Sequence, residues 1–116
     1  MPITIYHNPK CSKSRATLTL LQERGIEPDV VRYLDTPLDV EQLQRLLSLL
    51  GFEQPRQLMR IKDALYKELE LDKTERSNLE LLQAMQQHPK LIERPIVVNG
   101  DKAVLGRPPE NVLDIL

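Results

Sequence analysis

The chain has 116 residues, which is enough for one compact domain with a buried core. Its hydrophobic fraction of 41% and charged fraction of 28% are typical of a globular protein. The 16 basic and 17 acidic side chains give a formal net charge of -1, and only three tyrosines and one phenylalanine are available to stack on bases, so the composition argues against a nucleic-acid binder.

The N-terminal part of the chain is predicted to begin with a strand and a helix. Ile3–Tyr6 is short, β-branched and aromatic, which favours a strand. Asn8-Pro9 ends that strand. Ser12 or Ser14 is expected to cap a helix that runs to about Arg24.

A second strand and a helical region follow. Gly25 is placed to end the first helix, and Asp29–Leu34 is predicted to be a strand parallel to the first. The apolar spacing over 40–50 predicts a helix that Gly51 stops. Three shorter helices are expected at Pro55–Met59, Ala64–Leu69 and Leu79–Met85.

The C-terminal part is predicted to form a hairpin and a helix. Ile96–Val98 and Ala103–Leu105 flank an Asn99-Gly100 step, and an Asn-Gly turn between two apolar runs favours a β-hairpin. Glu110–Leu116 is expected to be a final helix, entered through Pro108-Pro109. The resulting order is β-α-β, a helical insert at approximately 39–90, then β-β-α. This α/β order resembles a thioredoxin-like fold with an inserted helical subdomain, and we expect 1–116 to form a single domain.

The single cysteine of the chain, Cys11, lies where the first strand gives way to the first helix. Free backbone N–H groups and the positive end of the helix dipole are expected to face its sulfur. Lys10, Lys13 and Arg15 add positive charge, and His7 lies just upstream. Such surroundings lower the pKa of a thiol and favour a nucleophilic thiolate. The alternatives are a packing cysteine and a His7 that only hydrogen-bonds the loop.

Three arginines are candidates for binding an anion. Arg94 and Arg107 each precede a proline at a predicted end of the hairpin, and Arg60 ends a short predicted helix. In a thioredoxin-like fold the turn containing Pro95 would lie beside Cys11, with the proline often cis. Guanidinium groups grip tetrahedral oxyanions with two hydrogen bonds. Each arginine could equally be an ordinary solvated surface residue.

Three separated segments resemble those of the glutaredoxin-coupled arsenate reductase family (ArsC-like). They are Tyr6-His-Asn-Pro-Lys-Cys-Ser-Lys-Ser-Arg15, His88-Pro-Lys-Leu-Ile-Glu-Arg-Pro-Ile-Val-Val98 and Gly106-Arg-Pro-Pro-Glu110. The resemblance implies that Cys11 is the nucleophile and that His7 assists the thiolate. It also implies an oxyanion-binding trio of Arg60, Arg94 and Arg107. From the local sequence, Ser14 and Arg15 are expected to support the helix N-terminus. Some members have a second cysteine just before the last arginine, where this chain has Gly106.

The same resemblance implies an oxidoreductase that reduces arsenate to arsenite. One cysteine cannot close its own disulfide, so a second thiol must come from outside. By resemblance that thiol is the co-substrate glutathione, and glutaredoxin then clears the mixed disulfide. We expect no bound cofactor, and no metal because no Cys/His cluster has ligand spacing. We also expect a cytoplasmic monomer without membrane or nucleic-acid partners.

Three other functions make different demands on the sequence. A phosphatase-like arsenate reductase needs an arginine six positions after its cysteine, and this chain has Thr17 there. An Spx-like regulator that binds RNA polymerase often uses a Cys-x-x-Cys switch, whereas here the pair is Cys11 and Ser14. A glutaredoxin-like thiol reductase, with the arginines binding glutathione carboxylates, remains a third alternative.

Overall fold

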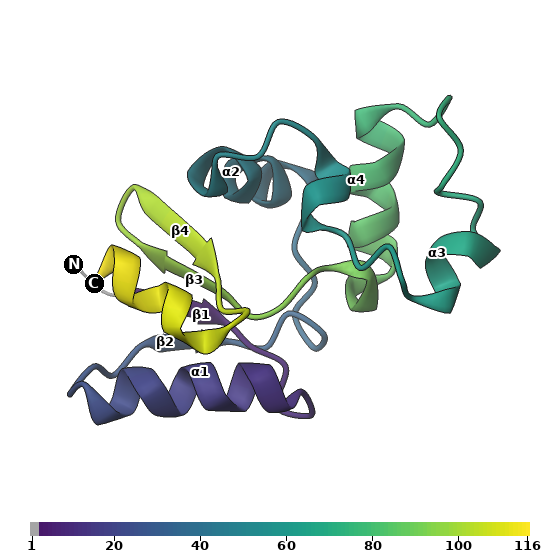
Figure 1. The fold of residues 1–116 in the computed structure, drawn as a ribbon. Helices are drawn as coiled ribbons and strands as arrows, with labels where there is room; N and C mark the ends of the chain where they lie inside the picture. Colours follow the sequence, from purple (N-terminus) through teal and green to yellow (C-terminus); the bar gives the residue numbers. More distant parts are fainter. Residues whose placement is uncertain (1–2) are drawn as a thin grey trace. The chain divides into compact units, whose positions relative to one another are not determined.

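The computed structural model describes residues 3–116, and Figure 1 shows their fold. The elements follow the order β-α-β, a run of helices, then β-β and a last helix, so the predicted α/β, thioredoxin-like order is confirmed. The chain divides into two compact units. One contains the residues up to Thr36 together with Arg94–Leu116, and the other is Pro37–Glu93. The expected domain start at residue 1 lies outside the described residues.

A four-stranded mixed sheet forms the centre of the first unit. Its order is β2-β1-β3-β4, and the strands are β1 (Ile3–Tyr6), β2 (Asp29–Val31), β3 (Ile96–Asn99) and β4 (Lys102–Leu105). β1 pairs with β2 in parallel and with β3 in antiparallel orientation. The expected hairpin joins β3 to β4, and Gly100 in its turn has a φ of 65°, a left-handed conformation that glycine adopts without strain.

Helix α1 (Ser12–Glu23) and the 3₁₀ helix η3 (Pro109–Ile115) pack together beside this sheet (Figure 1). Their inward side chains join those of the central strands in one apolar core, made of Ile5, Leu21, Val97, Val112 and Ile115. Gly25, with a φ of 76°, follows the end of α1 as expected. Because α1 is anchored by this core, its N-terminus is held at the end of β1.

Two elements of this unit differ from the sequence-based prediction. The second strand was expected over Asp29–Leu34 but ends at Val31, because the backbone N–H groups of Asp35 and Thr36 turn back to the carbonyl of Arg32 at 2.9 Å each. The last helix was expected to be an α-helix over 110–116 but is a 3₁₀ helix. Its two opening prolines lack N–H donors, and the side chain of Asn111 ties its start to the carbonyls of Leu105 and Arg107.

The second unit is helical. It contains α2 (Val40–Leu50), η1 (Pro55–Leu58), α3 (Ala64–Glu68), α4 (Asn78–Gln87) and η2 (Pro89–Leu91), of which η2 was not predicted. Capping boxes start two of the helices, Asp39 with Gln42 for α2 and Ser77 with Glu80 for α4. Gly51 ends α2 in a left-handed conformation with a φ of 74°, as expected.

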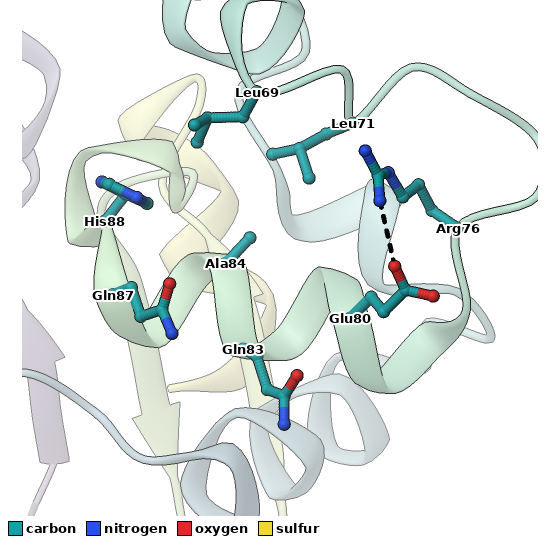
Figure 2. Close-up of a pocket in the computed structure, with 8 residues that line it drawn as sticks. All are labelled: Leu69, Leu71, Arg76, Glu80, Gln83, Ala84, Gln87 and His88. Carbon is teal, nitrogen blue, oxygen red and sulfur yellow. Dashed lines mark hydrogen bonds and ion pairs between the residues drawn. The ribbon is translucent and has the colours of Figure 1, made fainter.

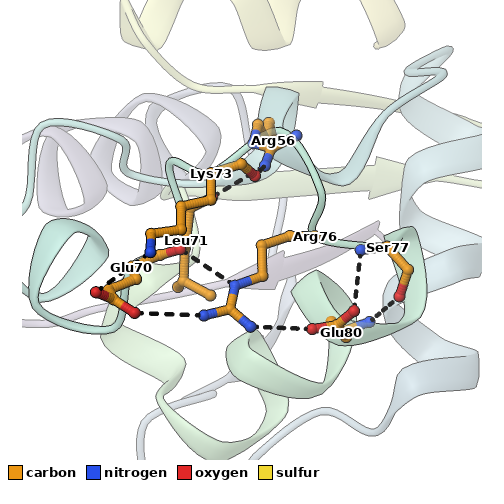
Figure 3. Close-up of polar contacts among 7 residues, drawn as sticks. All are labelled: Arg56, Glu70, Leu71, Lys73, Arg76, Ser77 and Glu80. Carbon is orange, nitrogen blue, oxygen red and sulfur yellow. Dashed lines mark hydrogen bonds and ion pairs between the residues drawn. The ribbon is translucent and has the colours of Figure 1, made fainter.

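Two arginines fix the segment between α3 and α4. The guanidinium of Arg56 donates to the carbonyls of Leu71 and Lys73 at 3.0 and 2.6 Å. Figure 3 shows Arg76 between two carboxylates, with Nη1 3.1 Å from Glu80 and Nη2 3.9 Å from Glu70. Because this segment has little regular structure of its own, these contacts define its path.

Candidate active site around Cys11

Cys11 is the residue that begins α1. Its φ of -94° and ψ of 124° are extended, and the helix starts at the next residue, so Cys11 occupies the N-cap position. The Cys11 N–H donates to the carbonyl of Asn8 at 3.0 Å, and its carbonyl accepts the first helical bond from Arg15 N–H at 3.0 Å. The expectation that Ser12 or Ser14 caps this helix is therefore wrong. An N-cap cysteine has its side chain among the free N–H groups of the first turn.

The pKa of the Cys11 thiol lies below its ordinary value, although the largest single effect, burial of the half-buried sulfur, raises it. The opposing effects are the hydrogen bond from Ser14 N–H, the charge of Arg94, the hydrogen bond from Lys13 N–H and a hydrogen bond from the Arg94 side chain. The helix N-terminus thus acts as expected. The charges of Lys10, Lys13 and Arg15 and the imidazole of His7, which the sequence also suggested, are not among these causes.

His7 reaches this site through Ser14. Nδ1 of His7 lies 2.6 Å from the Oγ of Ser14, and the same Oγ accepts the Asn8 N–H at 3.0 Å. A serine hydroxyl has one proton and two lone pairs, so it can serve both partners. Both side chains are buried, His7 with 6% and Ser14 with 0% of its surface exposed. The pairing joins the end of β1 to the first turn of α1, and sequence reasoning missed it because the two residues are separated by the loop.

His7 is neutral in this environment. Burial first, and the charge of Arg32 second, lower the pKa of His7. A buried imidazole loses hydration on protonation, and a nearby guanidinium repels the imidazolium. His7 therefore supports the loop as an uncharged residue.

Arg94 and Arg107 lie at the two ends of the hairpin, as expected. The peptide bonds Arg94–Pro95 and Arg107–Pro108 are both cis. Nη1 of Arg107 lies 3.5 Å from the carbonyl of Arg94, so the two turns are neighbours. Nε and Nη1 of Arg94 are buried without a hydrogen-bond partner among residues 3–116. Since buried donors are nearly always paired, Arg94 has donors to offer a bound acceptor beside Cys11.

Two further predicted site residues are Arg60 and Arg15. Arg60 belongs to the helical unit, where Nη1 is 3.4 Å from a carboxylate oxygen of Asp63 and 3.5 Å from the carbonyl of Lys90. Arg15 is exposed on α1. Within the first unit, the structure brings together Cys11, Ser14, His7 and the two hairpin arginines.

Gly106 lies in a space that Thr17 and Pro95 leave too small for a side chain. A Cβ at this position would lie 2.6 Å from Thr17 Oγ1 and 2.8 Å from Pro95 Cγ. The hydroxyl oxygen of Thr17, which is fully buried, lies 2.8 Å from the carbonyl of Lys13 and 3.3 Å from that of Gly106, and its single proton is shared between these two acceptors. The Thr17 hydroxyl therefore links α1 to the turn that follows β4. Sequence reasoning gave no role to Thr17 beyond excluding a phosphatase loop.

No group of three His, Cys, Asp or Glu side chains in residues 3–116 is arranged to hold a metal ion. No helix of residues 3–116 is long and apolar enough to cross a membrane. A pocket of about 260 Å³ in the helical unit lies along α4 and includes Leu71, Arg76 and His88, none of them a predicted site residue (Figure 2).

A mixed sheet in this order, with a cysteine of lowered pKa at the N-cap of α1 and an arginine before a cis-proline beside it, defines a thioredoxin-like protein. The model of the ArsC family matches residues 6–115, and the chain belongs to this family.

Similar proteins support this placement. The chain is 54% identical over 116 residues to a protein named arsenate reductase from Haemophilus influenzae, covering 100% of both chains. It is 57% identical over 114 residues to the uncharacterized protein YfgD of Escherichia coli, covering 98% of this chain and 96% of the relative. A solved structure described as an arsenate reductase from Vibrio cholerae is 56% identical, with a TM-score of 0.98 and coverage of 100% of this chain and 98% of that one.

Proposed function

We propose that this chain is an arsenate reductase in which Cys11 is the nucleophile. The observation that carries the proposal is the lowered pKa of Cys11 beside Arg94, a guanidinium with two buried donors that have no partner among residues 3–116. The thiolate supplies the attacking electron pair, and the donors suit a tetrahedral oxyanion. Relatives named arsenate reductase, 54% identical over the full chain, support the same substrate.

The reaction proceeds in two steps that use two thiols. The Cys11 thiolate attacks the arsenic of arsenate and forms an S–As bond, while an arsenic-bound oxygen leaves as water after protonation. An external thiol, glutathione, then attacks the Cys11 sulfur. The S–As bond breaks, its electron pair stays on arsenic, and arsenite leaves. The product is a Cys11–glutathione disulfide, so the two thiols have supplied the two electrons. Glutaredoxin reduces this disulfide and returns Cys11.

Three arginines bind the oxyanion in this proposal. Arg94 donates beside the Cys11 sulfur, and Arg107, whose Nη1 lies 3.5 Å from the Arg94 carbonyl, contributes from the neighbouring turn. Arg60 completes the trio from the helical unit. Their positive charge stabilises the transition state as the leaving oxygen departs. His7 and Ser14 are positioning residues, because their hydrogen bond holds the end of β1 to the first turn of α1, whose N–H groups face the sulfur.

We also propose the domain, the oligomeric state and the compartment in which the reaction takes place. The residues 1–116 act as one functional domain, with the helical insert at approximately 39–90 contributing Arg60. The chain works as a monomer without a bound cofactor or metal. Because its one cysteine must remain reduced, the cytoplasm is the compartment that suits it.

The experiment that tests the proposed function is a coupled assay. NADPH consumption is followed with glutathione, glutathione reductase and glutaredoxin, with and without arsenate. An arsenate-dependent rate that Cys11→Ser abolishes is expected. No arsenate-dependent rate, or an equal rate in Cys11→Ser, contradicts the proposal. A glutathionylated peptide in place of arsenate distinguishes the alternative of a glutaredoxin-like thiol reductase.

A further inference from the structure

A second pocket of the first unit adjoins the loop that contains the nucleophile. It has a volume of about 230 Å³ and is lined by residues 7–10 of the loop after β1 and by Arg32, Leu34 and Asp35 after β2. The two segments are joined by a hydrogen bond from His7 N–H to the Val31 carbonyl at 2.8 Å. Lys10 immediately precedes Cys11 in the chain, so one wall of the pocket continues directly into the active-site cysteine.

The charges in this pocket have a defined pattern. Lys10 and Arg32 are cations, Asp35 is an anion, and His7 is neutral because burial and the charge of Arg32 lower its pKa. Nε of Arg32 and Oδ2 of Asp35 form an ion pair at 3.1 Å, with 59% and 63% of the two side chains exposed. Such an exposed pair contributes little stability by itself. Both partners can therefore turn to a ligand at small cost.

We propose that this pocket binds one end of glutathione, the thiol that attacks at Cys11; the inference rests on the proposed function. Glutathione has two carboxylates and one ammonium, which is the inverse of two cations and one carboxylate in the pocket. Arg32 pairs with the α-carboxylate of the γ-glutamyl group, and Asp35 pairs with its ammonium. Lys10 attracts the glycine carboxylate.

The size of the pocket limits what it holds. Pockets that enclose a drug-sized ligand have volumes of about 300–1,000 Å³. At about 230 Å³ this pocket encloses the γ-glutamyl end alone, and the glycine end stays outside it, within reach of the exposed Lys10 side chain. The cysteine of glutathione then lies at the rim on the side of Lys10, next to Cys11.

The pocket is tested by a reaction that needs no arsenate. The Cys11 thiolate attacks one sulfur of oxidised glutathione, forms the Cys11–glutathione disulfide and releases glutathione thiolate, so that the S–S bond broken is replaced by the one formed. The second-order rate is measured by mass spectrometry. The uncharged disulfide of 2-mercaptoethanol is the reference probe, because it reports the reactivity of Cys11 without needing the pocket.

The variants remove the charges one at a time. Arg32→Gln and Lys10→Gln are each expected to slow the reaction with oxidised glutathione by about threefold to tenfold and to change the reference rate by less than about twofold. Arg24→Gln is the matched control, since it removes an exposed cation from the far end of α1. It is expected to alter neither rate. Equal slowing with both disulfides in Arg32→Gln overturns the proposal.

The variant Asp35→Asn tests whether the pocket recognises a zwitterion or any anion. The probes are oxidised glutathione and its analogue without the two α-amino groups. In Asp35→Asn the ratio of the glutathione rate to the analogue rate is expected to fall by about twofold to fivefold, because the ammonium loses its partner. An unchanged or increased ratio overturns the assignment of Asp35.

The two proposals fail in different ways. A chain that reduces arsenate but shows the same disulfide rates in all variants contradicts the pocket alone. A chain that shows the expected rate ratios but has no arsenate-dependent activity contradicts the proposed function alone.

Discussion

Ser14 connects His7 to Cys11 through two different atoms. Its Oγ lies 2.6 Å from Nδ1 of His7, and its backbone N–H, in the first turn of α1, is among the groups that lower the pKa of the Cys11 thiol. The side chain therefore fixes the loop, while the main chain of the same residue stabilises the thiolate. His7 influences the Cys11 thiol by position, without a direct charge.

Ser14→Ala is expected to destabilise the protein. It leaves Nδ1 of His7 and the Asn8 N–H without their buried partner, which costs about 1–3 kcal/mol in the free energy of unfolding. Urea denaturation measures the change. Ser12→Ala, an exposed position in the same helical turn, is the control and is expected to change stability by less than about 0.5 kcal/mol. Equal stability of the two variants would contradict the role of the Ser14 hydroxyl.

The Cys11 thiol is expected to titrate below the value of about 8.5 for a free cysteine. Arg94→Gln is expected to raise its pKa, because the variant loses the charge and the hydrogen bond that stabilise the thiolate. Arg15→Gln is expected to leave it unchanged, because Arg15 is not among the causes of the shift. The pKa of Cys11 in the wild type and in both variants is measured from the pH dependence of alkylation by iodoacetamide. Sulfate or arsenate is expected to raise the wild-type midpoint by placing negative charge near the sulfur.

Stability is expected to fall as the pH is lowered through the titration of His7. Burial and the charge of Arg32 lower the pKa of His7 in the folded state, so the unfolded chain binds more protons between that pKa and the ordinary value of about 6.5. The contribution of His7 to the free energy of unfolding is therefore fully present above about pH 6.5 and is lost progressively below it. His7→Gln removes this part of the pH dependence. Urea denaturation across this range tests it, and an identical pH dependence in wild type and His7→Gln would refute it.

Arg94→Ala and Arg107→Ala are each expected to lower kcat/KM for arsenate by about tenfold to a thousandfold, the scale for losing a charged donor to a transition state. Arg60→Ala is also expected to lower kcat/KM for arsenate. Arg24→Ala serves as the control for loss of an exposed charge. The coupled NADPH assay measures each variant. Wild-type kinetics in Arg94→Ala would show that the turn containing Pro95 is not part of the active site.

Gly106→Ala is expected to destabilise the protein by about 1–3 kcal/mol through overpacking, because the new Cβ meets Thr17 and Pro95. The effect should be smaller in a Thr17→Ala background, where two of the three close atoms are absent. A double-mutant cycle in urea provides the coupling energy. Additive effects would mean that Thr17 does not limit the space at Gly106.

Local patterns predicted most of the fold. The Ile3–Tyr6 strand and the 40–50 helix have the expected bounds, because β-branched and aromatic content, apolar spacing and a following glycine are properties of the segment alone. The second strand was too long in the prediction because its end depends on a turn at Arg32. The last helix depends on contacts with Asn99 and Leu105, which lie on other elements.

The site was predictable where it depends on chain neighbours. Cys11 at a helix start follows from Asn8-Pro9 and the residues after it. The His7–Ser14 pairing and the pocket at Arg32 and Asp35 depend on how β1, β2 and α1 meet in space. A single sequence does not specify which side chains of separate elements come into contact. For that reason the source of the lowered Cys11 pKa was only partly anticipated.

The crowding at Gly106 has a kinetic consequence. The space beside Thr17 and Pro95 is already filled, so position 106 has no room for a larger side chain such as that of a second cysteine. Cys11 is the one cysteine of the sequence, so in the proposed reaction the adduct at Cys11 cannot decay by attack of a second thiol of the same chain. Its lifetime depends on encounters, and turnover becomes first order in the surrounding thiol until the binding of that thiol saturates. The output of such an enzyme follows the thiol supply of its compartment as closely as it follows the oxyanion.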